Sequence, residues 1–139
     1  MKYLIGDIGN TSTKICILNK EFKIFRSYEF QTDKIYKGSF FKKFLSNKLT
    51  KDFNKFFLFS SVVPKAFKEI KKKFRNSKYK FIEIKDFDLK KIIRINIKNK
   101  HRLGSDRIAN AIGVQKYKNS LVLVFCTATT YDAIKNGKY

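Results

Sequence analysis

The stretch that most constrains this chain is Gly6–Lys14, with the sequence Gly-Asp-Ile-Gly-Asn-Thr-Ser-Thr-Lys. It lies between two apolar runs, 3–5 and 15–18, and so predicts the turn of a β-hairpin rather than a loop that opens a helix. A phosphate loop of the Walker type, which needs a following helix, is thereby excluded. The bend combines backbone N–H groups of a tight turn with polar side chains, from Gly9, Asn10, Thr11, Ser12 and Thr13.

A bend of this kind can hold the oxygens of a phosphate, because N–H and hydroxyl groups converge on one point. Asp7, at the end of the first strand, repels a phosphate but can hold a hydrated Mg²⁺ that the phosphates also bind. For this turn taken alone, an ordinary polar hairpin is the simpler interpretation.

A second copy of the pattern near the C-terminus favours the phosphate interpretation. An apolar run, 121–123, leads into the hydroxyl-rich stretch 124–130, and a further strand leads to an Asn136-Gly137 hairpin turn. Two such turns predict two similar lobes that each present a turn to one nucleotide. The copies differ at several matched positions, which are Val124 for Asp7, Cys126 for Gly9 and Thr127 for Asn10.

Composition narrows the class of protein. The 139 residues are 43% hydrophobic, no apolar run approaches the ~20 residues of a membrane span, and the chain begins directly in a predicted strand. We therefore expect a soluble cytoplasmic protein with no membrane partner. The net charge of +21 suggests nucleic acid, but only five of the 32 basic residues are arginines and the lysines are spread along the chain. We expect no specific nucleic-acid binding.

The middle of the chain predicts alternating strands and helices. Residues 21–30 complete an antiparallel meander, and Ser39 can cap a helix. Phe56–Phe59 is an apolar strand of the kind that is buried on both faces. Pro64 opens a helix that runs to about residue 75. Its solvated face is expected to carry Lys65, Lys68, Lys71, Lys72 and Lys73.

Beyond residue 79 the pattern predicts a strand, 79–84, a possible short strand within 92–97, and a helix that begins at Gly104 or Ser105. Asp106 then lies in the first turn of this helix. It either complements the helix dipole, or accepts a hydroxyl proton while Arg107 holds an anionic group. An architectural boundary near residue 118 predicts a first lobe over 1–118 and the start of a second, incomplete lobe over 119–139.

Four stretches together resemble one family. They are Asp7–Thr11, Ser60–Pro64, Gly104–Arg107 and Thr127–Asp132. The chain resembles the type III pantothenate kinases of the actin-like sugar-kinase and chaperone-ATPase superfamily. The resemblance implies an α/β fold, with an actin-like ATPase (ribonuclease H-like) lobe made of an antiparallel meander plus helices. The first strand pair of a second, incomplete lobe follows it.

The resemblance also implies an activity, which is ATP-dependent phosphorylation of pantothenate to 4′-phosphopantothenate, the first step of coenzyme A biosynthesis. It implies a homodimer, Mg²⁺, and K⁺ or NH₄⁺. Asp106 would be the general base, and Asp7 would hold the Mg²⁺ through water. Pantothenate would be bound by Gly104, Ser105, Asp106 and Arg107. ATP would be bound by Asp7, Ile8, Gly9, Asn10, Thr11, Ser12, Thr13, Lys14 and Thr127.

The chain departs from the family pattern in the second turn. Where the family has an acid that faces the monovalent cation, this chain has Val124, whose side chain supplies no oxygen, so we expect that site to be lost. Cys126 stands where the family has a glycine. Both changes are expected to impair phosphoryl transfer. Two alternatives therefore stay open, which are an inactive remnant that pairs with another lobe or subunit and a regulatory or nucleic-acid-binding relative.

Overall fold

The computed structural model describes residues 1–97, 103–125 and 129–139. They form two compact units, Met1–Glu83 and Ile84–Tyr139. The lobe boundary predicted near residue 118 stays a prediction. In this structure, residues 84–118 belong to the same unit as the strand pair that follows them.

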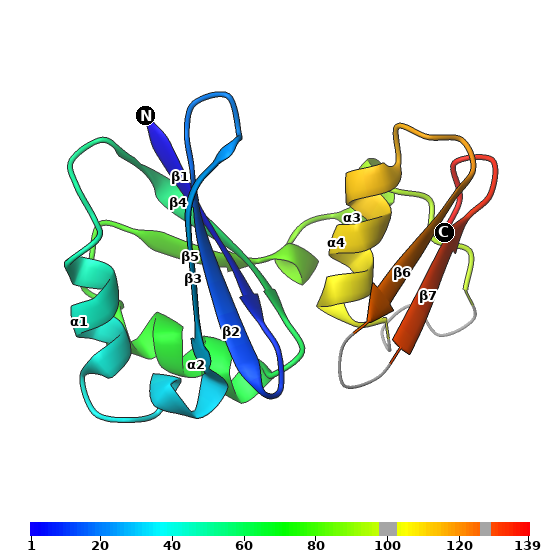
Figure 1. The fold of residues 1–139 in the computed structure, drawn as a ribbon. Helices are drawn as coiled ribbons and strands as arrows, with labels where there is room; N and C mark the ends of the chain where they lie inside the picture. Colours follow the sequence, from blue (N-terminus) through cyan, green and yellow to red (C-terminus); the bar gives the residue numbers. More distant parts are fainter. Residues whose placement is uncertain (98–102, 126–128) are drawn as a thin grey trace. The chain divides into compact units, whose positions relative to one another are not determined.

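The first unit is built on a five-stranded sheet (Figure 1). Its strands have the order β3-β2-β1-β4-β5. β1, β2 and β3 form the predicted antiparallel meander, whereas β4 runs parallel to both β1 and β5. The strands are β1 (Lys2–Ile8), β2 (Ser12–Leu18), β3 (Ile24–Gln31), β4 (Phe53–Ser61) and β5 (Lys80–Glu83). The expected meander is confirmed.

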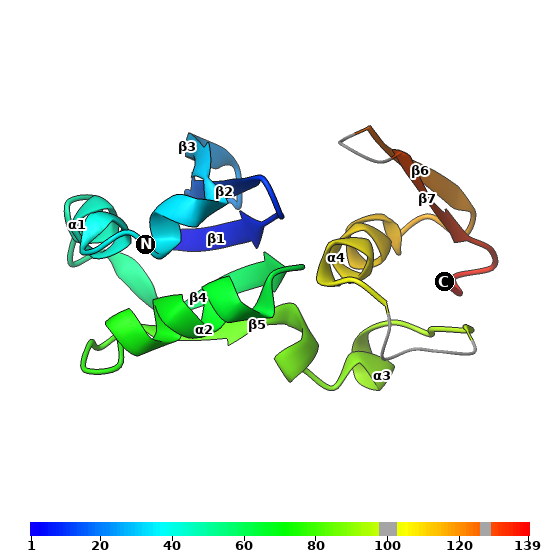
Figure 2. The ribbon, with the colours of Figure 1, turned by 90° about the horizontal axis from the view of Figure 1, so that it is seen from below.

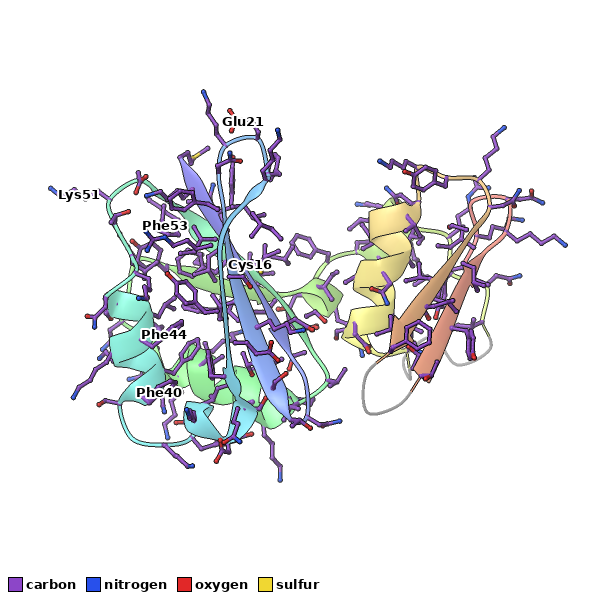
Figure 3. All side chains as sticks on the ribbon, viewed as in Figure 1. Cys16, Glu21, Phe40, Phe44, Lys51 and Phe53 are labelled. Atoms are coloured by element: carbon purple, nitrogen blue, oxygen red, sulfur yellow. The ribbon has the colours of Figure 1, made fainter. Side chains whose placement is uncertain are left out.

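Helices α1 (Phe40–Ser46) and α2 (Pro64–Lys73) pack on one face of this sheet (Figure 2). A short 3₁₀ helix, η1 (Thr32–Ile35), follows β3 and precedes α1 in the chain. Alternate residues of the strands point to this face, because side chains along a strand alternate between the two faces. The core between helices and sheet is rich in phenylalanine, with Phe41, Phe57 and Phe59 fully buried. Figure 3 shows Phe40 and Phe44 along α1, and both rings contact Phe30 of β3.

The prediction that 56–59 is buried on both faces is wrong. Phe57 and Phe59 are fully buried beneath the helices, but Phe56 is 53% exposed and Leu58 is 38% exposed. The residues that alternate with the buried pair lie on the opposite face of the sheet, where α1 and α2 do not reach. A short apolar run cannot reveal whether one or both of its faces are covered.

The lysine-rich helix also differs from expectation at one residue. The side chain of Lys73 is only 13% exposed, and its ammonium group donates to the carbonyl oxygens of Ile35 (2.5 Å) and Gly38 (2.9 Å). These two bonds tie the end of α2 to the segment after β3. Lys73, which was expected on the solvated face, therefore has a structural role.

The second unit contains a helix packed against a two-stranded sheet. Helix α4 (Ser105–Val114) contacts both β6 (Ser120–Phe125) and β7 (Thr129–Ile134), which pair with each other in antiparallel register. A 3₁₀ helix, η2 (Ile84–Asp86), and the one-turn helix α3 (Leu89–Ile92) precede α4. The predicted short strand within 92–97 is wrong, because only an isolated bridge forms there, between Arg94 and Lys138.

The predicted turn at Asn136-Gly137 is confirmed. Both residues have positive φ, 52° and 71°, as a two-residue hairpin turn requires. Lys135 and Lys138 exchange backbone hydrogen bonds across it. Within the described ranges, the structure contains no helix with the length and hydrophobicity of a membrane span.

Candidate functional site

The turn between β1 and β2 is tight and presents polar residues to solvent. Gly9 N–H donates to the carbonyl oxygen of Ser12 at 2.9 Å, and Asn10 and Thr11 are exposed at the tip. A Cβ on Gly9 would lie 3.0 Å from the same carbonyl oxygen. A side chain at position 9 would therefore crowd the closed turn. The exposed tip can receive a ligand from solvent.

A pair of buried threonines supports the turn from below. The hydroxyl of Thr32 donates to the carbonyl oxygen of Gly9 at 2.7 Å and contacts the hydroxyl of Thr13 at 3.0 Å. The backbone N–H of Thr32 also donates to the carbonyl oxygen of Thr11 at 2.9 Å. Thr13 and Thr32 are 0% and 3% exposed. The structure thus gives the Thr13 side chain a supporting position, although the sequence placed it among the ATP contacts.

Sequence reasoning missed Thr32. The available signal was a threonine directly after a strand that ends beside the hairpin turn, because Gln31 pairs with Ser12. The side chain of Ile8 is also fully buried, so only its backbone is available to a ligand. Ser12 is half-buried, and Lys14 is exposed and forms a 3.9 Å ion pair with Glu29.

The first two sequence motifs meet at the ends of two neighbouring parallel strands. Asp7 of β1 is paired in register with Ser60 of β4, and Val62 N–H donates to the carbonyl oxygen of Ile8 at 3.0 Å. The carboxylate of Asp7 belongs to an exposed residue. Beside it, the buried hydroxyl of Ser60 has no hydrogen-bond partner among the described residues. Ligands bind preferentially at such strand ends in α/β sheets.

This donor set fits a hydrated divalent cation. Mg²⁺ keeps several water ligands and takes one or two carboxylates, and Asp7 is an accessible carboxylate beside the hydroxyl of Ser60. A metal site made of protein ligands alone is not found in the described part of the chain, because no group of three or more metal-binding side chains occurs there.

The third motif forms the start of α4, as predicted. Gly104 is the N-cap residue, and Asp106 lies in the first turn. Ser105 is 1% exposed, and its hydroxyl has no hydrogen-bond partner in the described part of the chain. Asp106 and Arg107 are half-buried, so both side chains remain accessible.

A buried carboxylate contacts Arg107. Asp132 of β7 is 0% exposed, and its Oδ1 lies 3.7 Å from the Nε of Arg107. Tyr139 donates its phenolic hydrogen to the same oxygen at 2.5 Å, while the amide of Asn110 donates to Oδ2 at 3.0 Å. Burial, followed by the hydrogen bond to Asp132 and the negative charge of that carboxylate, raises the pKa of Tyr139 to about 12. The guanidinium of Arg107 partly offsets this rise.

The sequence did not predict this cluster. Asp132 was recognised only as the last residue of a motif, and Asn110 and Tyr139 were not singled out. The available signal was the i, i+3 spacing of Arg107 and Asn110, which places both on one side of a helix.

The second hydroxyl-rich turn gives less information. Cys126 and Thr127 lie outside the described residues, so the expected contact of Thr127 with ATP stays a prediction. Val124 is described, and it pairs with Thr130 across the hairpin. Its hydrocarbon side chain offers no oxygen to K⁺ or NH₄⁺ and so does not fit a monovalent-cation ligand.

Comparison with known proteins decides the family. A sequence profile described as type III pantothenate kinase matches residues 3–139. The chain belongs to the type III pantothenate kinase family. Among its curated relatives, the type III pantothenate kinase of Pelagibacter ubique (strain HTCC1062) is 42% identical over 139 residues, which cover 98% of this chain and 55% of the relative. The enzyme of that name from Thermosipho melanesiensis is 32% identical, again over 98% of this chain and 55% of the relative.

This member of the type III pantothenate kinase family thus spans about 55% of the length of these relatives. Solved structures support the expected actin-like α/β fold. A protein from Listeria monocytogenes described as a candidate N-acetylmannosamine kinase has a TM-score of 0.54 at 15% identity, covering 99% of this chain and 48% of that one. A candidate sugar kinase from Cytophaga hutchinsonii gives 0.52 at 16% identity, with 99% and 49% coverage.

Proposed function

We propose that this chain phosphorylates pantothenate to 4′-phosphopantothenate with ATP, the first step of coenzyme A biosynthesis. The observation that carries the proposal is the family match over residues 3–139, which spans every motif named above. The geometry of each unit supports it. The first unit exposes a turn rich in hydrogen-bond donors, and in the second Asp106 and Arg107 are consecutive, accessible residues in the first turn of α4.

In the proposed mechanism the β1–β2 turn binds the phosphates of ATP through its N–H and hydroxyl groups. Asp106 accepts the proton of the substrate hydroxyl, whose oxygen forms a bond to the γ-phosphorus as the bond to ADP breaks. Arg107 holds an anionic group of the substrate, because a guanidinium pairs well with carboxylates and phosphates. Ser105 offers a buried hydroxyl beside Asp106 as a further hydrogen-bonding group.

Asp7 would hold Mg²⁺ through water in this proposal, with the hydroxyl of Ser60 nearby. The bound ion would neutralise phosphate charge. We include a homodimer in the proposal because of the family resemblance. We also include a cytoplasmic location without membrane or specific nucleic-acid partners, because of the composition and the spread of the lysines along the chain.

The test is ATP-dependent formation of phosphopantothenate by the purified chain. Asp106→Asn should reduce turnover about 100-fold or more, because it removes the proton acceptor while keeping the shape of the side chain. Asp88→Asn is a suitable control, since Asp88 is an exposed acid of the same unit at the start of α3. Equal turnover by the wild-type and Asp106→Asn proteins would exclude Asp106 as the base.

One observation favours the alternative of a non-catalytic chain that pairs with further protein. The outer face of the β6–β7 hairpin is apolar and exposed, with Leu121 at 61%, Phe125 at 75% and Tyr131 at 65%. Uncovered apolar surface of this kind is typical of protein contact sites. Sedimentation of the purified chain distinguishes the two. Measurable turnover by a defined dimer supports the proposed kinase, whereas an inactive chain that aggregates supports the alternative.

A further inference from the structure

Asp132 is a charged residue with no access to solvent. Its side chain projects from β7 and is 0% exposed. Burial of an ionised carboxylate is costly unless hydrogen bonds and an opposite charge compensate for it. The contacts of Asp132 show how its buried charge is compensated.

Three side chains compensate for this carboxylate, and two of them come from α4. Arg107 and Asn110 are one helical turn apart, so both face β7 from the same side of the helix. Asn110 contacts Oδ2, whereas Arg107 contacts Oδ1. The carboxylate therefore holds two residues of the helix that also carries Asp106.

The third partner, Tyr139, is itself fixed in place by the backbone. Its N–H donates to the carbonyl oxygen of Arg94 at 2.9 Å, and its carbonyl oxygen accepts from Asn96 N–H at 2.7 Å. The phenol thus reaches Oδ1 of Asp132 from a defined position. Both carboxylate oxygens are engaged, which fixes the plane of the carboxylate.

The contact with Arg107 has a consequence for the guanidinium. The carboxylate lies next to Nε, at the inner end of the guanidinium group, and the side chain as a whole is 38% exposed. An arginine side chain is long and has many rotamers, so a contact at Nε restricts the orientation of its two terminal nitrogen groups. Those terminal groups are the ones that bind an anion in a bidentate manner.

We propose that Asp132 is a positioning residue that, with Asn110 and Tyr139, orients the guanidinium of Arg107 toward an anionic group of the substrate. The proposal rests on the proposed function, because that function assigns Arg107 to the pantothenate site. It goes further by giving a role to a buried acid of β7 and to two residues outside the family motifs discussed above.

The first measurement uses the wild-type chain alone. The sequence has only five arginines, so the Nε–H signals can be resolved by NMR and that of Arg107 identified by its loss in Arg107→Lys. The Arg107 signal should be shifted and slow to exchange with water, unlike those of the exposed Arg26 and Arg75. Exchange as fast as that of Arg75 would overturn the proposal, whether or not the chain binds pantothenate.

The second measurement is a double-mutant cycle on pantothenate affinity, measured by titration calorimetry. Asp132→Asn should weaken binding about tenfold, because it removes the negative charge that lies 3.7 Å from Nε and restricts the orientation of the guanidinium. In an Arg107→Lys background, Asp132→Asn should have little further effect, because the orientation of the guanidinium no longer matters. An equal loss in both backgrounds indicates general loss of structure and overturns the proposal.

Asn110→Ala is the matched control, since it removes the partner of Oδ2 and leaves the contact of Oδ1 with Arg107. It should weaken pantothenate binding less than Asp132→Asn does. If the wild-type chain binds no pantothenate, the proposed function fails at that step, while the Nε–H exchange of Arg107 still decides the positioning role.

Discussion

The two hairpins of this molecule share a sequence pattern but have very different surroundings. The β1–β2 hairpin lies inside a five-stranded sheet, with β3 and β4 as its outer neighbours. The β6–β7 hairpin forms a sheet of only two strands, supported by α4 on one face. Two strands alone are marginally stable in water, so the second hairpin depends on its helix, whereas the first shares the stability of a full core.

The polar groups that support each hairpin differ as well. Below the first turn lies a neutral pair of hydroxyls, Thr13 and Thr32, which needs little compensation for burial. The second hairpin instead carries a buried carboxylate of its own, Asp132 of β7, which needs several partners at once. The comparison teaches that similar strand patterns can be stabilised by hydrophobic packing in one place and by a charged network in another. Four predictions test it.

Truncation of a core ring should have the largest effect on stability. It should also distinguish the unit that contains the first hairpin from the unit that contains the second. Phe57 of β4 is fully buried against the rings of Phe53, Tyr79 and Phe81. Phe57→Ala should lower the free energy of unfolding of the first unit by about 3 to 5 kcal/mol. The change is measured by urea titration followed by backbone NMR signals, which report on each unit by itself.

Phe125→Ala is the matched control for this experiment. Phe125 of β6 is 75% exposed, so its truncation should change stability by less than about 0.5 kcal/mol. Similar losses from the two substitutions would contradict the difference in packing between the two hairpins.

A methyl group added to Gly6 should also destabilise the first unit. A Cβ there would lie 2.2 Å from an atom of the fully buried Phe59 ring, so the ring or the strand must shift to admit it. Gly6→Ala should therefore cost about 1 to 3 kcal/mol by overpacking. Gly113 lies in α4, and an added Cβ would have nothing within 4 Å. Gly113→Ala should therefore raise the free energy of unfolding by about 1 kcal/mol, because alanine favours a helix more than glycine does. Thermal unfolding of both variants checks the opposite signs.

Removal of one hydroxyl should weaken the support of the first turn. Thr32→Val leaves the carbonyl oxygen of Gly9 and the hydroxyl of Thr13 without their partner, which should cost about 1 to 2 kcal/mol. Thr50→Val, which removes an exposed hydroxyl bonded to Asp52, serves as the comparison and should cost less. A neutral Thr32→Val variant in urea unfolding would show that packing alone shapes the turn.

High pH should weaken the second unit selectively. The pKa of Tyr139 is raised in the folded chain from 10.0 to about 12, so the folded state binds the proton more tightly than the unfolded state. The stabilisation by this phenol is complete below pH 10 and is lost as the pH rises toward about 12. The effect should be the smallest of the four, because Tyr139 is partly exposed. The stability of the second unit, measured by hydrogen exchange, should decline more steeply with rising pH in wild type than in Tyr139→Phe.

Much of the first unit could be predicted from alternation and turn residues. The hairpin around Gly9-Asn10, the meander and the Pro64 helix all follow local rules that the structure confirms. The covered face of β4 could not be predicted, because Phe56 and Phe57 are the same residue with opposite surroundings. Lys73 was missed for a related reason. Its lysine run looks uniform in the sequence, and only the position of the Ile35 and Gly38 carbonyl groups distinguishes one member.

The candidate site divides in the same way. The sequence motifs identified Asp7, Asp106 and Arg107, because their residue types and local context carry the chemistry. Thr32 and Asn110 were not identified, since each acts on a residue distant in the sequence, Gly9 and Asp132 respectively.

The sequence by itself determined the family, the two hairpin patterns and the residues expected to bind and react, because these depend on neighbours within a few positions. Only the tertiary structure decided which face of the sheet is covered, which lysine is half-buried, and which acid lies next to Arg107. Those outcomes depend on contacts between residues far apart in the chain, and hydrophobic burial and charge compensation act on distance in space rather than on distance in sequence.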